Sequence, residues 1–268
     1  VPVLREFFSE DLGRKLSESA KQADLIIGNN VYAHVPDIKD FTKGLKFVLK
    51  KGGTITLEFP HLLRLIEDAQ FDTVYHEHFS YLSLYTVQEI FKNTGLRIWD
   101  VEEISTHGGS LRIYGCHEDD CRKTKESVNN ILKNELEMGL QNLKTYLEFQ
   151  PKANKIKDDF IEFLMECKKN GKKILAYGAA AKGNTLLNFS GVKSNLLPLI
   201  FDAAYAKQGK YMPGSHIPIL ASNELKNYSP DYVLIFPWNI AGEIKKQLAD
   251  VFEVEPKYVA AVPKLHFI

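Results

Sequence analysis

Short apolar runs alternate with segments of helical periodicity along much of the chain, and this alternation limits the possible folds most strongly. Residues 23–30 (ADLIIGNN) form an apolar run ending in Gly and Asn, which is typical of a buried parallel strand entering a loop. Residues 40–49 have apolar side chains at helical spacing, and residues 54–59 (TITLEF) again predict a strand. This β-α-β order predicts a parallel sheet with right-handed crossovers.

The middle of the chain changes character. Residues 97–102 and 110–116 predict two strands, which we expect to pair antiparallel around a turn at 106–109. Residues 118–170 are rich in Lys and Glu and carry leucines at helical intervals. They predict two long helices that connect two domains, with most of their charge on solvated surface.

A second α/β unit follows the connector. Residues 173–177, 197–201 and 231–236 predict strands, and residues 178–185 open a helix after the first of them. The predicted fold class is therefore α/β with two sheets. We expect one domain over residues 1–117, a helical connector over 118–170 and a second domain over 171–268.

Composition excludes several classes of protein. Of the 268 residues, 44% are hydrophobic and 25% charged, which is ordinary for a globular protein. Lys+Arg and Asp+Glu both number 34, so no basic field indicates a nucleic acid or an anionic membrane as partner. No apolar run approaches the roughly 18 residues of a membrane span, and no signal peptide is recognisable. The three cysteines are too few for a zinc site or a disulfide framework, so we expect no metal and a cytoplasmic protein.

The densest group of chemically active side chains is Tyr75, His76, Glu77 and His78. Each is costly to bury without partners, and one imidazole facing a cleft could serve as an acid/base. An ordinary polar loop with satisfied histidines is an equally good interpretation of the spacing. His34 follows a predicted strand, where ligands of open α/β sheets bind.

Glycine-containing loops form the second group of candidates. The turn that contains His107 and Gly109 could bring backbone close to a ligand, or could be only a tight turn between strands. Residues 178–183 (GAAAKG) follow a strand and open a helix. The N-terminus of a helix favours the binding of an anion, and Lys182 adds a positive charge there. The loop is neither a Walker A motif nor a Gly-x-Gly-x-x-Gly fingerprint. Asp202 ends the next strand, where nucleotide hydroxyls are often bound.

Six motifs occur together in one order along the chain. They are NNVYAHV (29–35), FDTVYHEHFSY (71–81), HGGSLR (107–112), YGAAAKGNTLLN (177–188), KQGKYMPGSHIP (207–218) and FPWN (236–239). In this combination the chain resembles the sugar C-methyltransferases, which use S-adenosylmethionine to methylate C3 of a 4-keto deoxysugar carried on dTDP. The resemblance covers nearly the whole chain. It implies a class I methyltransferase domain, only its C-terminal part present here, followed by a Rossmann-like domain that binds the nucleotide sugar.

The resemblance also implies roles for particular residues. His78 would be the base that removes the proton on C3, with Tyr75, Glu77 and His34 as its supporting and polarising neighbours. The cofactor S-adenosylmethionine would contact Asn30, Ala33 and Glu58. The residues expected to bind substrate are His107, Gly109, Gly178, Ala180, Lys182, Asn184, Asp202, Lys207, His216, Trp238 and Asn239.

The chain departs from the family at its start. Family members begin with a cysteine-rich zinc segment, a strand and a Gly-rich cofactor loop, and none of these is present. We expect residues 1–3 to belong to the third strand of the methyltransferase sheet, with a missing N-terminal segment or a partner chain supplying the rest. Two other functions stay open: a nucleotide-sugar oxidoreductase or epimerase, and a non-catalytic nucleotide-sugar-binding fragment. The missing glycine fingerprint and the absence of a Tyr-x-x-x-Lys pair count against the oxidoreductase.

Overall fold

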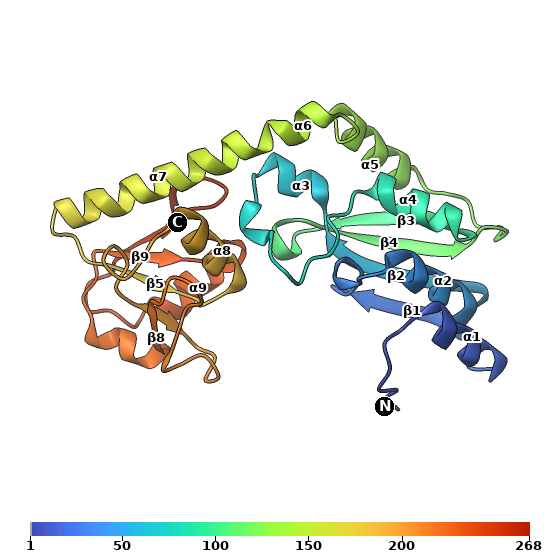
Figure 1. Cartoon of the computed structure of the whole chain (residues 1–268), viewed down its shortest axis with the longest axis horizontal. Helices are drawn as coiled ribbons and strands as arrows, with labels where there is room; N and C mark the ends of the chain where they lie inside the picture. The colour runs from blue at the N-terminus through green and yellow to red at the C-terminus, as the bar shows by residue number, and fades with distance from the viewer. Residues whose placement is uncertain (1) are drawn as a thin grey trace. The chain divides into compact units, whose positions relative to one another are not determined.

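The computed structural model describes residues 2–268, which divide into two compact units (Figure 1). Unit 1 comprises residues 2–66 and 76–146, and unit 2 comprises Glu67–Tyr75 and Leu147–Ile268. The short segment Glu67–Tyr75 therefore packs with the C-terminal half of the chain, although in sequence it interrupts unit 1. The residues expected to form one connector, 118–170, are divided between the two units.

Unit 1 is built on a four-stranded sheet in the order β1-β2-β4-β3. β1 and β2 are parallel, and β4 pairs antiparallel with both β2 and β3. The elements of this part of the chain are α1 (Glu10–Glu18), β1 (Ala23–Asn29), η1 (Tyr32–His34), α2 (Ile38–Val48), β2 (Leu49–Pro60), α3 (Leu62–Glu67), α4 (Leu84–Asn93), β3 (Leu96–Ile104), η3 (Thr106–Gly108), β4 (Ser110–His117), α5 (Glu126–Glu137) and α6 (Leu143–Leu147).

Local sequence explains how the crossover between β1 and β2 forms. Asp37 caps α2 by accepting hydrogen bonds from the backbone N–H groups of Lys39 and Asp40. The buried face of α2 carries Phe41 and Leu45, which join the core of the sheet. This confirms the predicted β-α-β order and the antiparallel pair that follows it.

One expectation for unit 1 is wrong. Residues 2–9 contain no strand, and Val3 and Leu4 are exposed, so residues 2 and 3 do not belong to the sheet. Val1 lies outside the described residues. The first strand in the described residues is β1, whose Leu25 and Ile27 side chains are exposed.

The helical region after β4 contains three helices rather than the two we expected: α5, α6 and α7 (Phe149–Lys169). α5 ends near Gly139, which has a φ of +80° and so favours glycine. Pro151 does not break α7, because it lies in the first turn, where its missing N–H has no intrahelical partner.

Unit 2 is built on a seven-stranded sheet in the order β11-β10-β9-β5-β6-β8-β7. The strands from β10 to β8 are parallel, and β11 and β7 pair antiparallel at the two edges. Besides α7, its elements are η2 (Phe71–Thr73), β5 (Ile174–Tyr177), α8 (Ala181–Ser190), β6 (Ile200–Asp202), β7 (Lys210–Tyr211), β8 (Pro218–Ala221), η4 (Ser222–Asn227), β9 (Tyr232–Ile235), η5 (Trp238–Ile240), α9 (Ala241–Leu248), β10 (Lys257–Ala260) and β11 (His266–Phe267).

Both faces of this sheet are buried. Ile174 and Ala176 of β5 belong to one core with α7 and α8, whereas Leu175 and Tyr177 belong to a second core with α9. Alternate residues of one strand therefore face opposite helical layers, and such strands appear in sequence as continuous apolar runs. The predicted α/β class with two sheets is confirmed.

The strand order of unit 2 fixes where a ligand can bind. From β5 the chain continues to β6 on one side, and it later returns to β9 on the other side of β5. Open α/β sheets bind ligands outside the carboxyl ends of the strands where the order reverses in this way. That point lies between Tyr177, at the end of β5, and Ile235, at the end of β9.

Candidate functional site

Two imidazoles meet at the carboxyl end of β1 in unit 1. His34 ends η1, and the centroid of its ring lies 4.9 Å from that of His78, with the rings inclined at 61°. The His78 ring also contacts Tyr81, edge to face, with centroids 6.0 Å apart. Both histidines are half-buried. The structure thus brings together two of the side chains that the sequence singled out.

Backbone hydrogen bonds hold this pair in place. The N–H groups of Phe79 and Ser80 both donate to the carbonyl oxygen of Ala33, at 2.9 and 3.2 Å. These bonds fasten the loop that follows His78 to the turn that carries His34. Ala33, expected to contact the cofactor, uses its carbonyl oxygen inside the protein.

The other members of the cluster are placed differently. His76 and Glu77 are exposed, and Tyr75 is half-buried within unit 2, whereas residue 76 begins the second part of unit 1. The segment is a loop, neither extended strand nor helix. The partner of His78 that sequence reasoning missed is Tyr81, which lies within the same motif.

Glu58 of β2 is buried, and its carboxylate is hydrogen-bonded within unit 1. Its carboxylate accepts hydrogen bonds from Arg112 Nη2 at 3.0 Å and from Thr106 Oγ1 at 3.1 Å. The carboxylate raises the pKa of the Arg112 guanidinium. Its backbone oxygen accepts the N–H of Asn30, whose side chain is exposed beyond the end of β1. Three residues were expected to contact the cofactor. Asn30 is exposed, whereas Ala33 and Glu58 are buried.

The turn between β3 and β4 brings backbone close to a side chain of the protein. Gly109 has a φ of +114°, and a Cβ there would lie 2.7 Å from Cγ of Arg64. His107 is exposed, with a φ of +57°. The turn requires glycine for its own packing, whether or not His107 binds substrate.

In unit 2 three predicted residues converge at the point where the strand order reverses. Lys182, near the start of α8, donates from Nζ to Asn239 Oδ1 at 3.1 Å. The same Nζ lies 4.1 Å from the centroid of the Trp238 ring, within reach of a cation–π interaction. β5 and β9 position these side chains, because the loops after the two strands meet there. A Cβ at Gly178 would lie 2.5 Å from Cδ of Pro237, so that close approach requires glycine.

A fourth side chain at this point, Asp72, was not predicted. Asp72 is 1% exposed, and its Oδ2 accepts the indole N–H of Trp238 at 2.7 Å. Burial raises the pKa of Asp72, and the positive charge of Lys182 opposes that shift. Burial likewise lowers the pKa of Lys182, and Asp72 opposes it. The motif at residues 71–81 mixes polar and apolar side chains, so the sequence carries no signal that Asp72 is buried.

Asp202 organises the neighbouring loop after β6. Its Oδ2 accepts the N–H of Ala179 at 2.7 Å, and its Oδ1 accepts the N–H of Ala204 at 2.7 Å. Lys207 Nζ donates to the carbonyl oxygen of Ala179 at 2.9 Å and lies 3.3 Å from Asp202 Oδ2. Both predicted substrate residues therefore also hold the loop that precedes α8.

The remaining predicted residues of unit 2 lie on the loops around α8. Ala180 is the residue before α8 and provides no side-chain cap. Asn184 lies in the first turn of α8, and its buried Oδ1 accepts no hydrogen bond from the described residues. His216 is exposed in the loop between β7 and β8, with a φ of +57°.

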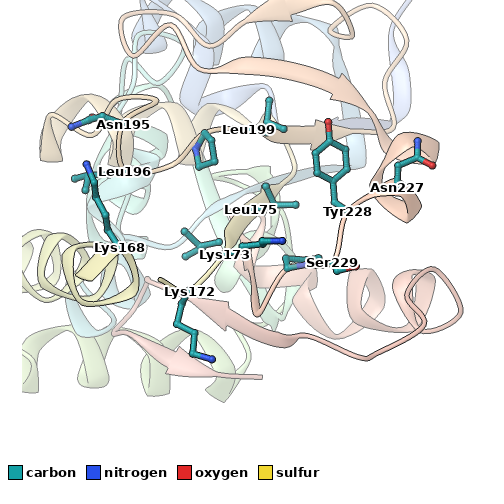
Figure 2. A pocket seen from close by; sticks show the side chains of 13 residues that line it. Lys168, Lys172, Lys173, Leu175, Asn195, Leu196, Leu199, Asn227, Tyr228 and Ser229 are labelled. Carbon is teal, nitrogen blue, oxygen red and sulfur yellow. The ribbon is translucent and has the colours of Figure 1, made fainter. Parts of the chain in front are cut away.

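A cavity of about 610 Å³ lies elsewhere, at the amino ends of β5 and β9 (Figure 2). Its lining includes Leu175, Leu199 and Tyr228 together with Lys168 and Lys173. None of the predicted site residues lines it. Since parallel sheets bind ligands at the opposite edge, the strand order favours the Lys182 region instead.

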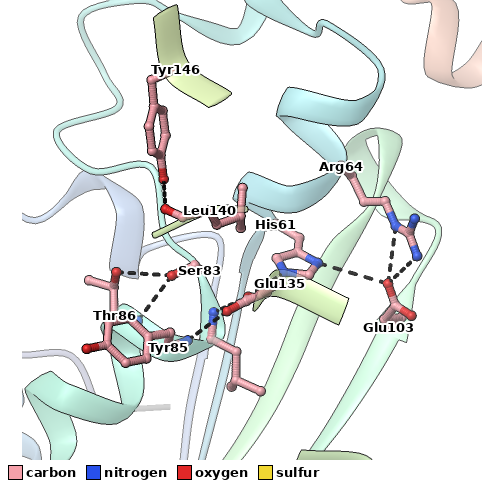
Figure 3. A network of polar contacts seen from close by, with 10 residues as sticks. His61, Arg64, Ser83, Tyr85, Thr86, Glu103, Glu135, Leu140 and Tyr146 are labelled. Atoms are coloured by element: carbon pink, nitrogen blue, oxygen red, sulfur yellow. Dashed lines mark hydrogen bonds and ion pairs between the residues drawn. The ribbon is translucent and has the colours of Figure 1, made fainter. Parts of the chain in front are cut away.

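Unit 1 contains a buried polar network that the sequence did not reveal (Figure 3). Glu135 of α5 is 2% exposed, although we expected most charge of that region to be solvated. Its Oε1 lies 2.7 Å from His61 Nε2, and its carboxylate accepts the N–H groups of Leu84 and Tyr85 at the start of α4. The network fastens α5 to the first turn of α4, which is a structural role.

Two family models match the chain. The model described as a C-methyltransferase C-terminal domain matches residues 105–263, and one described as a methyltransferase domain matches residues 4–101. The chain belongs to the C-methyltransferase family. The resemblance stated from the motifs is thereby confirmed at the level of C-methyltransferases, while the sugar and its nucleotide stay predictions.

A curated relative agrees with this assignment. The C-methyltransferase NovU of Streptomyces niveus is 31% identical over 257 residues, which are 96% of this chain and 61% of NovU. The chain thus spans about three fifths of the length of that relative.

Solved structures are more distant. Magnesium protoporphyrin IX methyltransferase (ChlM) from Synechocystis PCC 6803 is 14% identical, with a TM-score of 0.30 over 38% of this chain and 48% of that one. An O-methyltransferase family protein from Burkholderia thailandensis is 12% identical, with a TM-score of 0.32 over 44% of this chain and 36% of that one. With TM-scores this low, neither structure supports an inference about this chain.

Two features are absent from residues 2–268. No three His, Cys, Asp or Glu side chains there are grouped as a metal site would need. No helix in that range has both the length and the apolar character to cross a bilayer.

Proposed function

We propose that this chain serves an S-adenosylmethionine-dependent C-methyltransferase that methylates C3 of a nucleotide-linked 4-keto deoxysugar, with dTDP as the nucleotide. The observation that carries the proposal is the pair of imidazoles, His34 and His78, at the carboxyl end of β1 in a member of the C-methyltransferase family. The relative NovU is described as a C-methyltransferase, which supports the reaction class.

The residues of unit 1 fit the proton chemistry of such a reaction. A ketone at C4 acidifies the proton on C3, and a neutral imidazole can accept that proton near neutral pH. We assign this step to His78. The electron pair of the broken C–H bond moves toward the ketone, so the substrate becomes an enolate whose oxygen needs hydrogen-bond donors. His34 beside His78 can supply such a donor. Glu77 and Tyr75, the latter being the last residue of the segment that packs in unit 2, are the further candidates for support.

The cofactor would bring a methyl group on a positively charged sulfur to the carbon that has lost its proton. Asn30 fits one wall of a cofactor site, because its exposed side chain lies just beyond β1. Glu58 and the carbonyl oxygen of Ala33 fit less well, since their acceptor atoms already receive hydrogen bonds within unit 1.

Unit 2 would hold the nucleotide part of the substrate. α8 directs its N-terminal end toward the region where the strand order reverses, and a helix N-terminus attracts phosphate. Lys182, Trp238 and Asn239 lie there together and offer a positive charge, a ring face and an amide. A positive charge can pair with a diphosphate, and a ring face and an amide can contact a nucleoside.

The experiment that tests the proposal is a methyl-transfer assay with the full-length protein. It is incubated with methyl-labelled S-adenosylmethionine and a dTDP-4-keto-deoxysugar, and the product is analysed by mass spectrometry and NMR. We expect label at C3 of the sugar. Label on oxygen, or a change in the sugar that does not require S-adenosylmethionine, would contradict the proposal, and the latter would favour the epimerase alternative.

A further inference from the structure

The segment that leads into the acid/base loop is anchored by contacts inside unit 2. η2 packs against α8, and the Phe71 ring lies 5.2 Å from that of Phe189, measured between centroids. Asp72 accepts the indole N–H of Trp238 at 2.7 Å. The segment is folded on itself as well, because the N–H of Val74 donates to the oxygen of Phe71 at 3.0 Å.

The burial of Asp72 needs an explanation beyond packing. A carboxylate taken out of water is expensive, and an apolar side chain would fill the same place at lower cost. Oδ1 of Asp72 accepts no hydrogen bond from the described residues. A void of about 10 Å³ lies beside Asp72, Lys182 and Trp238, which is about the room that one water molecule needs. The buried hydrogen bond between Asp72 and Trp238 therefore occupies a place where an apolar contact would cost less free energy.

The position of Asp72 in the chain suggests what the contact is for. Residue 75 is the last of the segment that packs in unit 2, and residue 76 is the first of the next part of unit 1. Asp72 therefore comes four residues before His76 and six before His78. A bond that fixes Asp72 fixes the start of the loop that carries the histidines.

We propose that Asp72 is a positioning residue: through its hydrogen bond with Trp238 it holds the segment 71–75, and so sets the placement of the loop that carries His78. The proposal rests on the methyl-transfer function, because His78 is the base in that function. Asp72 itself touches neither substrate nor cofactor in this account. Trp238 contributes its N–H to Asp72 and its ring face to Lys182.

The decisive variant is Trp238→Phe in the full-length protein, because it removes the N–H donor and keeps an aromatic ring beside Lys182. We expect kcat to fall about tenfold, since a small misplacement of a reacting group is costly, while KM for the nucleotide sugar stays within about twofold. The amides of Thr73 and Val74 should exchange hydrogen about fivefold faster, which is the effect of losing one hydrogen bond.

Variants of Asp72 provide the second test. Asp72→Asn keeps an oxygen that can accept the indole N–H, so it should retain more of kcat than Asp72→Leu, which keeps none. The matched controls are Trp99→Phe, whose buried indole N–H has no hydrogen-bond partner among the described residues, and Asp231→Asn, which pairs with Lys172 on the surface. Both controls should leave kcat unchanged.

The outcomes separate this proposal from the proposed function. A wild-type protein that transfers no methyl group would contradict the function, and hydrogen exchange over residues 71–78 would still test the anchor. If Trp238→Phe keeps both wild-type kcat and wild-type exchange at Thr73 and Val74, the positioning role is wrong. A rise in KM with unchanged kcat would also overturn it, because that result would assign Trp238 to substrate binding alone.

Discussion

Lys182 places its ammonium group over the ring of Trp238, with Nζ 4.1 Å from the ring centroid. The two residues are 56 positions apart in sequence and meet because α8 follows β5 while Trp238 follows β9. Their contact marks the point of unit 2 where a nucleotide is proposed to bind.

Replacing Lys182 tests that proposal. Lys182→Ala should weaken the binding of thymidine diphosphate about tenfold at low salt, because a hydrogen bond to a charged group is lost. The affinity of the variant for thymidine diphosphate should also depend less on salt concentration, since salt screens charge pairs over about 8–10 Å at physiological ionic strength. Thymidine should bind as before. Calorimetry over a salt series measures these quantities.

The control for this variant is Lys226→Ala, an exposed lysine of η4. It should leave thymidine diphosphate binding unchanged. If Lys182→Ala binds the diphosphate as tightly as the wild-type chain at every salt concentration, Lys182 serves packing against Trp238 and contacts no phosphate.

The 268-residue chain is expected to bind S-adenosylmethionine weakly by itself. Glu58 is committed to Arg112 and Thr106, and the oxygen of Ala33 to two backbone donors, which leaves Asn30 as the available contact among the three. We expect a Kd of roughly millimolar or weaker by calorimetry. Micromolar binding would mean that the described residues form a more complete cofactor site than these contacts indicate.

Removal of Glu135 should destabilise the protein strongly. Its carboxylate accepts two backbone N–H groups and lies against His61, and Glu135→Ala would leave all three unsatisfied in a buried place. We expect a loss of about 3 kcal/mol in the free energy of unfolding, measured with urea. Glu137→Ala, on the exposed side of α5, should change it by less than about 0.5 kcal/mol. Equal effects of the two variants would contradict the structural role of the network.

Acid should weaken the contact between Asp120 and Arg122. Hydrogen bonds from the side chain and then the backbone N–H of Arg122 hold the pKa of Asp120 well below its usual range. A lowered pKa in the folded state stabilises the protein above about pH 4, and this stabilisation is lost as pH falls toward the folded value. Asp120→Asn should therefore be less stable than wild type near neutral pH, with the difference shrinking in acid. Asp119→Asn, an exposed neighbour, should show no such trend.

The sequence predicted the regular elements well where periodicity is strong. The runs that became β5 and β9 are apolar because both faces of those strands are covered. β2 buries many of its side chains in the core of unit 1, whereas Leu25 and Ile27 of β1 are exposed, so the expected burial of residues 23–30 is wrong. Four strands of unit 2 were missed. β7 and β11 have two residues each and lie at the sheet edges, where no apolar run is needed, and β8 and β10 have only four residues each. The short helix α6 between α5 and α7 was missed because five residues are too few to show a helical period.

The candidate site could be predicted by residue type but not by pairing. The contact between the His34 and His78 rings depends on two backbone hydrogen bonds to the oxygen of Ala33. The pattern of side chains in the sequence does not predict these bonds. Asp72 and Glu135 share another reason for being missed. Acidic residues are normally solvated, and only tertiary structure supplies the donors that make their burial tolerable.

The most direct test of the account is proton exchange at C3 of the substrate. The full-length protein is incubated with a dTDP-4-keto-deoxysugar in deuterated water, with S-adenosylhomocysteine in place of the methyl donor, and C3 is followed by NMR. We expect the wild-type protein to exchange this proton. His78→Asn should slow the exchange at least about 100-fold without changing nucleotide affinity. Replacing a histidine near the C-terminus, as in His266→Asn, should leave the exchange rate unchanged. Exchange by His78→Asn at more than half of the wild-type rate would contradict the account, because His78 would then not be the base.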